Sequence, residues 1–210
     1  MKPTKKFVPE AARRGAAYTM AAAAAIGATD ADAAVVESGP QDISIAQFNS
    51  QNLNLDGDAY ADILLKNYVF LGGNYQGAYV NFAPGKVVGF FSGFGYASAL
   101  GPGSVIDAAT TAGGPFQASL AYGGNNPNAQ FNSVDRAFIG LAFPINAVTH
   151  YGWVRVSIDN TAGTFVINDW AYEDQPGVGI TTPVPEPGTL GMLAAGAAGV
   201  AALRRRRSAA

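Results

Sequence analysis

The sequence predicts an all-β protein whose central part folds as a single antiparallel β-sandwich. Short apolar runs alternate with turn residues throughout residues 34–183. No stretch of that region keeps a 3.6-residue apolar period, and two of its runs flank a short polar connection typical of a hairpin. A region of about 150 residues suits one domain with a substantial core. We therefore expect one sandwich of jelly-roll-like type.

The expected strands follow one another with turn residues between them. Ile43 and Ile45 alternate with polar residues, as in a strand with one buried face. Residues 93–115 are rich in Gly, Ala, Ser and Thr and predict long loops, with a short helix near 105–109. Further strands are expected at residues 62–70, 78–82, 86–91 and 137–143.

The clearest expected element is a hairpin with arms at residues 150–158 and 164–172. Residues 159–163, Asp-Asn-Thr-Ala-Gly, form its connection. The first arm alternates, so its two faces are predicted to hold different residues: Val154, Val156 and Ile158 on one, and Tyr151, Trp153 and Arg155 on the other.

The charge of the central region limits its partners. Residues 34–183 hold four basic and eleven acidic side chains, a net charge of −7. Nucleic acid needs clustered Lys and Arg and is excluded as a partner. Calcium and neutral sugars remain compatible with this charge.

The N-terminal residues 1–33 resemble a signal peptide in composition. Basic residues up to Arg14 precede a weakly apolar run at 16–28, and Ala31-Asp32-Ala33 supplies a small-x-small cleavage pattern. The chain has no cysteine, which suits an exported domain that uses no disulfide. We expect export with cleavage near Ala33.

Residues 184–210 have three parts in a fixed order. Pro185, Glu186 and Pro187 precede the uncharged run at 188–203, and Arg204, Arg205, Arg206 and Arg207 follow it. As a helix, the run would span roughly 24 Å against a hydrocarbon core of about 30 Å. The arginines would stay on the cytoplasmic side. We therefore expect a marginal transmembrane helix with the rest of the chain outside.

This order resembles the PEP-CTERM sorting signal of Gram-negative surface proteins, over roughly residues 183–207. The resemblance implies that exosortase, an integral-membrane processing enzyme, recognises Pro185, Glu186 and Pro187. It further implies transient anchoring in the inner membrane and delivery to the cell surface or extracellular polysaccharide matrix. HYGWVRV at 150–156 and DWAYE at 169–173 also resemble the central domain of many such proteins, without implying an activity.

One motif predicts a metal site. Oxygen-bearing side chains recur at alternate positions from Asn54 to Asp58 and again at Asp62, and Ca²⁺ takes six to eight oxygen ligands. The string resembles the calcium loops of FG-GAP repeats, from which Asn54 and Ala59 depart. An ordinary turn rich in Asn and Asp is the alternative. The candidate calcium ligands are Asn54, Asp56, Asp58 and Asp62.

Two functions are compatible with these features. The first is a non-enzymatic surface or matrix protein, structural or polysaccharide-binding, and its expected exposed aromatics are Tyr75, Tyr79, Tyr96 and Tyr122. The alternative is a secreted carbohydrate-active hydrolase that uses Glu173 and Asp169. The carboxylate pattern of a glycosidase is missing, so the first is favoured and no catalytic residue is assigned. His150, the only histidine, is expected to be a strand residue.

Overall fold

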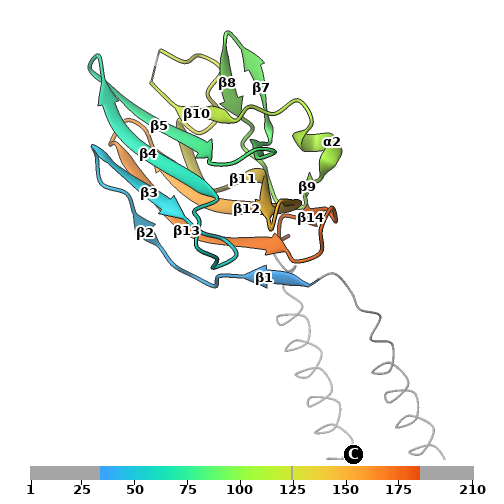
Figure 1. Cartoon of the computed structure of the whole chain (residues 1–210). Coiled ribbons are helices and arrows are strands. Elements are labelled where there is room, and N and C mark those ends of the chain that lie inside the picture. The colour runs from blue at the N-terminus through green and yellow to red at the C-terminus, as the bar shows by residue number, and fades with distance from the viewer. Residues whose placement is uncertain (1–33, 124, 185–210) are drawn as a thin grey trace, which may run out of the picture. The chain divides into compact units, whose positions relative to one another are not determined.

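The protein is described by a computed structural model over residues 34–123 and 125–184, and strands dominate it (Figure 1). Sheet A has the order β1-β13-β12-β11-β6, and β2 also pairs with β13. All its pairs are antiparallel. Its strands are β1 (Val35–Glu37), β2 (Ile43–Ser44), β6 (Lys86–Val87), β11 (Ser133–Ile145), β12 (Val148–Asp159) and β13 (Thr164–Glu173).

Sheet B has the order β3-β4-β5-β10-β8-β7. Its pairs are antiparallel except for β10 and β8, which run parallel. Its strands are β3 (Asn49–Leu53), β4 (Ile63–Phe70), β5 (Gly73–Val80), β7 (Gly89–Ser92), β8 (Phe94–Ala97) and β10 (Gln117–Ala121). The smaller elements are β9 (Val105–Ile106), α2 (Ala108–Thr111) and β14 (Ile180–Thr181), and β9 pairs with β14.

The main core lies between the two sheets. Alternate residues of β4, such as Ile63 and Leu65, are fully buried and pack in one cluster with Val154 and Val156 of β12. The sheets therefore face each other across an apolar layer, as the alternating pattern predicts. The β-rich fold is confirmed, and the jelly-roll-like connectivity stays a prediction.

The predicted hairpin is confirmed. β12 and β13 pair with Ser157 opposite Val166 and Asp159 opposite Thr164, and the register shifts once, between Arg155 and Val156. Val154, Val156 and Ile158 face the main core, and Trp153 lies on the other face. Asp159 caps the connection by accepting a hydrogen bond from the Ala162 N–H.

Three other expectations need correction. The run at 86–91 is two strands in different sheets, because the chain leaves β6 of sheet A and enters β7 of sheet B. The strand expected at 78–82 begins five residues earlier, at Gly73. The loops expected at 93–115 contain β8 and β9, and the short helix α2 follows Asp107, whose carboxylate accepts from the Thr110 N–H.

A second, smaller core covers the outer face of sheet A. Trp153 and Phe138 pack there against Ile106 of β9 and Ile180 of β14. Gly140 makes the close approach feasible, because a Cβ at this position would lie 2.8 Å from the Leu100 and Val88 side chains. The part of the hairpin's outward face around Trp153 is therefore buried under β9 and β14, which the alternation alone did not indicate.

A buried amide network joins the two sheets at one end. Asn67 and Gln76 of sheet B are fully buried, and Gln76 Nε2 donates to Asn67 Oδ1 over 2.8 Å. Asn160, in the β12–β13 connection, donates to Gln76 Oε1 and to the Asn74 carbonyl. Each of these buried polar groups thus finds a partner, as low-dielectric surroundings require.

The expectations for the chain ends fall outside the described residues. This applies to the signal peptide at 1–33, to Pro185, Glu186 and Pro187, and to Arg204, Arg205, Arg206 and Arg207. Within residues 34–123 and 125–184, no helix is long and apolar enough to cross a membrane.

Candidate functional site

An aromatic cleft lies on the outer face of sheet B. Tyr75 points away from the main core, because its neighbours Gln76 and Asn74 face inward and Ala78 belongs to that core. The cleft measures ≈ 660 Å³, within the usual range of ligand sites. Its lining is Phe70, Leu71, Tyr75, Phe91, Phe94, Gly95, Pro115, Phe116, Gln117, Ser119, Tyr122, Asn125 and Asn126.

A chain of ring contacts fixes one wall of the cleft. The Tyr75 ring meets the Tyr122 ring edge to face, with centroids 5.5 Å apart, and Phe70 lies 5.7 Å from Tyr75 on the other side. Tyr122 Oη donates to the Phe70 carbonyl over 3.1 Å. Edge-to-face ring pairs contribute about 0.5–1.5 kcal/mol each beyond their buried area. These contacts and the Tyr122 hydrogen bond therefore position the rings of this wall.

Two glycines of β5 allow the tyrosine rings to lie on the sheet. A Cβ on Gly77 would collide with the Tyr75 hydroxyl, and one on Gly73 would lie 3.2 Å from the Tyr122 ring. Burial raises the pKa of the Tyr75 hydroxyl above its usual value, and the neighbouring Tyr79 adds a smaller rise. The hydroxyl therefore stays a neutral hydrogen-bonding group.

The opposite wall consists of exposed phenylalanines. Phe91 of β7 and Phe94 of β8 expose 69% and 62% of their surfaces, and Phe116 exposes 48%. None of the described residues that line the cleft carries a charge, and the polar ones are amides and hydroxyls. Flat apolar rings beside neutral donors and acceptors suit a ligand with apolar faces and many hydroxyls.

The aromatic residues expected to be exposed have different positions. Tyr75 and Tyr122 line the cleft. Tyr79 lies under the ammonium group of Lys66, 3.8 Å from its ring centroid. Tyr96 is only 1% exposed and stacks on Phe90, so its expected exposure was wrong. The phenylalanines of the cleft were missed, although Phe91 and Phe94 flank a glycine-containing turn, which could have indicated exposed rings.

The predicted calcium loop joins β3 to β4 and is built from Asx turns. Asn54 Oδ1 accepts from the Gly57 N–H, Asp56 Oδ1 from the Asp58 N–H, and Asp62 Oδ2 from the Leu55 N–H. One oxygen of each residue thus serves the loop's own backbone. In the part of the chain that the structure describes, no three acidic or histidine side chains are grouped to hold a metal.

Two features of this loop are unusual. The Oδ2 atom of Asp56 is buried and has no hydrogen-bond partner. Asp62 is 4% exposed, and burial raises the pKa of its carboxyl to about 7. The Leu55 N–H opposes that rise, and the charges of Asp56 and Asp58 add to it. The loop therefore concentrates negative charge that its own contacts do not neutralise.

Asp62 is expected to make the free energy of unfolding depend on pH when it is measured in the presence of a chelator. Its carboxyl has a higher pKa folded than unfolded, so the folded state holds the proton more tightly, and the free energy of unfolding falls as pH rises from about 4 to about 7. Asp62→Asn is expected to remove this component. Urea unfolding of both proteins at several pH values checks it, and parallel pH profiles would contradict it.

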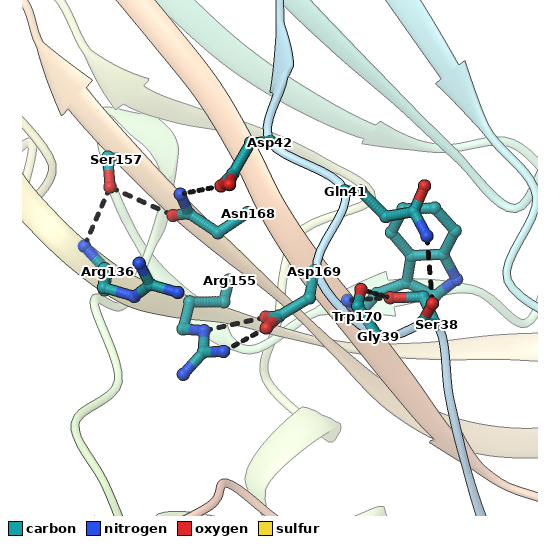
Figure 2. Close-up of polar contacts among 10 residues, drawn as sticks. All are labelled: Ser38, Gly39, Gln41, Asp42, Arg136, Arg155, Ser157, Asn168, Asp169 and Trp170. Carbon is teal, nitrogen blue, oxygen red and sulfur yellow. Dashed lines mark hydrogen bonds and ion pairs between the residues drawn. The ribbon is translucent and has the colours of Figure 1, made fainter.

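The acids of the alternative hydrolase hypothesis lie on β13. Both oxygens of Asp169 accept from the Arg155 guanidinium, with 2.7 Å between Arg155 Nε and Oδ1 (Figure 2). Glu173 is 2% exposed, and its Oε1 accepts from the Gln175 N–H. The Glu173 carbonyl lies 2.9 Å from His150 Nδ1. His150 is a buried residue of β12. Neither acid lines the aromatic cleft.

Figure 2 also shows a polar row beside this ion pair. Ser157 Oγ donates to Asn168 Oδ1, and Asn168 Nδ2 donates to Asp42 over 3.1 Å. Arg155 also lies 5.6 Å from the centre of the Phe138 ring. These contacts tie the segment before β2 to sheet A and leave Asp169 in a structural ion pair.

Comparison with known proteins gives one match. The family model of the PEP-CTERM protein-sorting motif matches residues 183–207. The match contains Pro185, Glu186, Pro187 and the four arginines from Arg204 to Arg207. Neither the curated proteins nor the solved structures contain a match to the chain.

Proposed function

We propose that this chain, which carries a PEP-CTERM sorting motif at residues 183–207, is a non-enzymatic surface protein that binds neutral polysaccharide. The motif implies export, recognition by exosortase and sorting toward the cell surface. The observation that carries the binding role is the uncharged aromatic cleft on sheet B.

The chemistry of the cleft favours a neutral glycan. Pyranose rings present apolar C–H faces that pack on aromatic rings, and their hydroxyls pair with exposed amides such as Gln117 and Asn125. An acidic glycan would need cationic partners, yet the described lining has none and residues 34–183 carry a net charge of −7. Delivery to a polysaccharide-rich surface would bring the cleft to its ligand.

The carboxylates support binding over hydrolysis. A glycosidase holds two carboxyl groups across the bond that it cleaves. No described residue that lines the cleft is acidic, and Asp169 is occupied by Arg155. These observations favour the non-enzymatic proposal over the hydrolase.

Affinity electrophoresis of the processed protein tests the proposal. Gels are cast with the producing organism's matrix polysaccharide, with a neutral β-glucan, or with alginate as an acidic control. Retardation by a neutral polymer but not by alginate is expected. Equal migration in all gels would leave a structural role without glycan binding, and release of reducing sugar would favour the hydrolase.

Calcium at the β3–β4 loop is a second proposal, favoured by the unpartnered Oδ2 of Asp56. Asn54, Asp56, Asp58 and Asp62 would have to turn toward one point to hold the ion, because the described structure does not group three of their carboxylates. The charge of the ion would neutralise the crowded carboxylates. Asp58 and Asp62 also line a cavity of ≈ 310 Å³, which leaves room for bound water beside an ion.

Calcium is expected to stabilise the folded protein. At a concentration a hundred times Kd, a ligand that binds only the folded state adds about 2.7 kcal/mol to the free energy of unfolding. Asp56→Asn should remove this effect, and Asp135→Asn should retain it. Urea unfolding in calcium and in chelator measures both, and identical curves for the unmodified protein would exclude the site.

A further inference from the structure

The described chain ends in a segment that is fastened to the domain. We call residues 178–184 the closing strap. Within it Ile180 lies opposite Ile106 of β9, and Ile180 is 2% exposed in the second core. Opening the strap would expose Ile180 and uncover Trp153 and Phe138. The strap is therefore part of the folded domain.

Among the described residues, Thr182 is the last one that hydrogen-bonds to the rest of the domain, and it does so through its N–H, its carbonyl and its hydroxyl. Its N–H donates to the Ser104 carbonyl over 2.9 Å, and its carbonyl accepts from the Gly103 N–H over 3.0 Å. Its hydroxyl accepts from the Ser104 N–H and donates to the Gly101 carbonyl. Thr182 is 1% exposed, so these bonds are shielded from water.

The sorting motif follows this attachment almost without a spacer. Its match begins at Pro183, and Pro185 is three residues after Thr182. Three residues reach at most about 11 Å even when fully extended. While the strap is closed, an enzyme that binds Pro185, Glu186 and Pro187 must therefore accommodate the folded domain beside it.

The surface around this point is rich in exposed valine. Segments 99–106 and 178–184 contain no Asp, Glu, Lys or Arg, and Asp107 borders them, with its Cβ 3.0 Å from the Cβ position of Gly179. Val105, Val178 and Val184 expose 50%, 37% and 61% of their surfaces, and a Val184 methyl lies 3.4 Å from the Cβ position of Gly103. In a domain with a net charge of −7, this valine-rich end with a single bordering carboxylate suits contact with a membrane enzyme.

We propose that the closing strap stays closed during sorting, and that exosortase binds its signal with the valine-rich end of the folded domain packed against it. This inference rests on the sorting motif and is independent of glycan binding.

The first test locks the strap with a disulfide. Val105 and Thr181 lie directly opposite each other on β9 and β14, and the chain has no cysteine to compete. Val105→Cys with Thr181→Cys, in the full precursor expressed with its exosortase, should be processed at the same rate in its oxidised and reduced forms. Precursor that accumulates when oxidised and is processed after reduction would show that the strap must open, and would overturn the proposal.

The second test separates contact from fold damage. Val105→Asp places a charge at the proposed contact and should slow processing about tenfold, because the charge must lose water there. The same substitution should have no effect in a precursor with ten Gly and Ser residues inserted between Thr182 and Pro183. Phe48→Asp, at another exposed residue, is the matched control.

Processing is followed as the ratio of precursor to mature protein over time, and urea unfolding of the mature variants reports on the fold. No slowing by Val105→Asp at native length would overturn the proposed contact. Equal slowing with and without the inserted residues would also overturn it, since damage to the strap would then explain the effect.

Discussion

Replacing Phe91 and Phe94 together with alanine is expected to abolish retardation of the protein in neutral-polysaccharide gels. Both rings are more than half exposed at the cleft, so their main contribution is to a bound ligand. Aromatic anchors of a binding site contribute on the order of tenfold or more each, so the double variant should bind about a hundredfold more weakly.

The matched control is Phe48→Ala, which removes a ring that is 66% exposed outside the cleft. This variant should bind as the unmodified protein does. The free energy of unfolding of the double variant should change little, because exposed rings contribute little to the core. Unchanged binding by the Phe91 and Phe94 variant would place the glycan site elsewhere, or show that the cleft binds none.

The second large effect is expected at Asn160, where alanine should lower the free energy of unfolding by about 3–5 kcal/mol. Removing its amide takes a partner from Gln76 Oε1 and from the Asn74 carbonyl. It also leaves the Gly123 N–H without its acceptor, Asn160 Oδ1, at 2.8 Å. The buried Gln76 Oε1 and two less buried backbone groups would then lack these partners at the junction of the two sheets.

Urea unfolding measures this loss, and Asn128→Ala is its control. Asn128 donates to Ser92 Oγ in an exposed position, so its removal should cost well under 1 kcal/mol. A loss at Asn160 no larger than that at Asn128 would show that water satisfies the freed groups. The amide network would then not be what fastens the sheets together.

Local patterns predicted the strands that bury one face. The alternation of Val154, Val156 and Ile158 correctly assigned the core face of β12, and the polar connection at 159–163 correctly placed the hairpin. These features are local, because a two-residue period and a turn can be recognised within a dozen residues. The β-rich fold followed from them.

The predictions that were wrong or missing concern contacts between residues distant in sequence. Lys86 and Phe91 belong to different sheets, and nothing in the apolar run between them marks the change. The wall of the cleft joins Phe70 to Tyr122, so no short motif predicts it. Tyr96 was expected to be exposed, yet Phe90 stacks on it and it is 1% exposed.

The calcium loop shows a further limit. The spacing of Asn54, Asp56, Asp58 and Asp62 is equally compatible with an ion and with a set of Asx turns. The structure contains the turns, and it adds the unpartnered Oδ2 of Asp56, which depends on burial and could not be predicted from spacing.

The closing strap also determines when the fold can be completed. Its partner strand β9 lies far earlier in the chain, and the second core remains uncovered until Ile180 arrives. Synthesis from the N-terminus delivers this residue among the last of the described domain, immediately before the sorting motif. The fold therefore receives its last described strand just before the sorting motif itself is made.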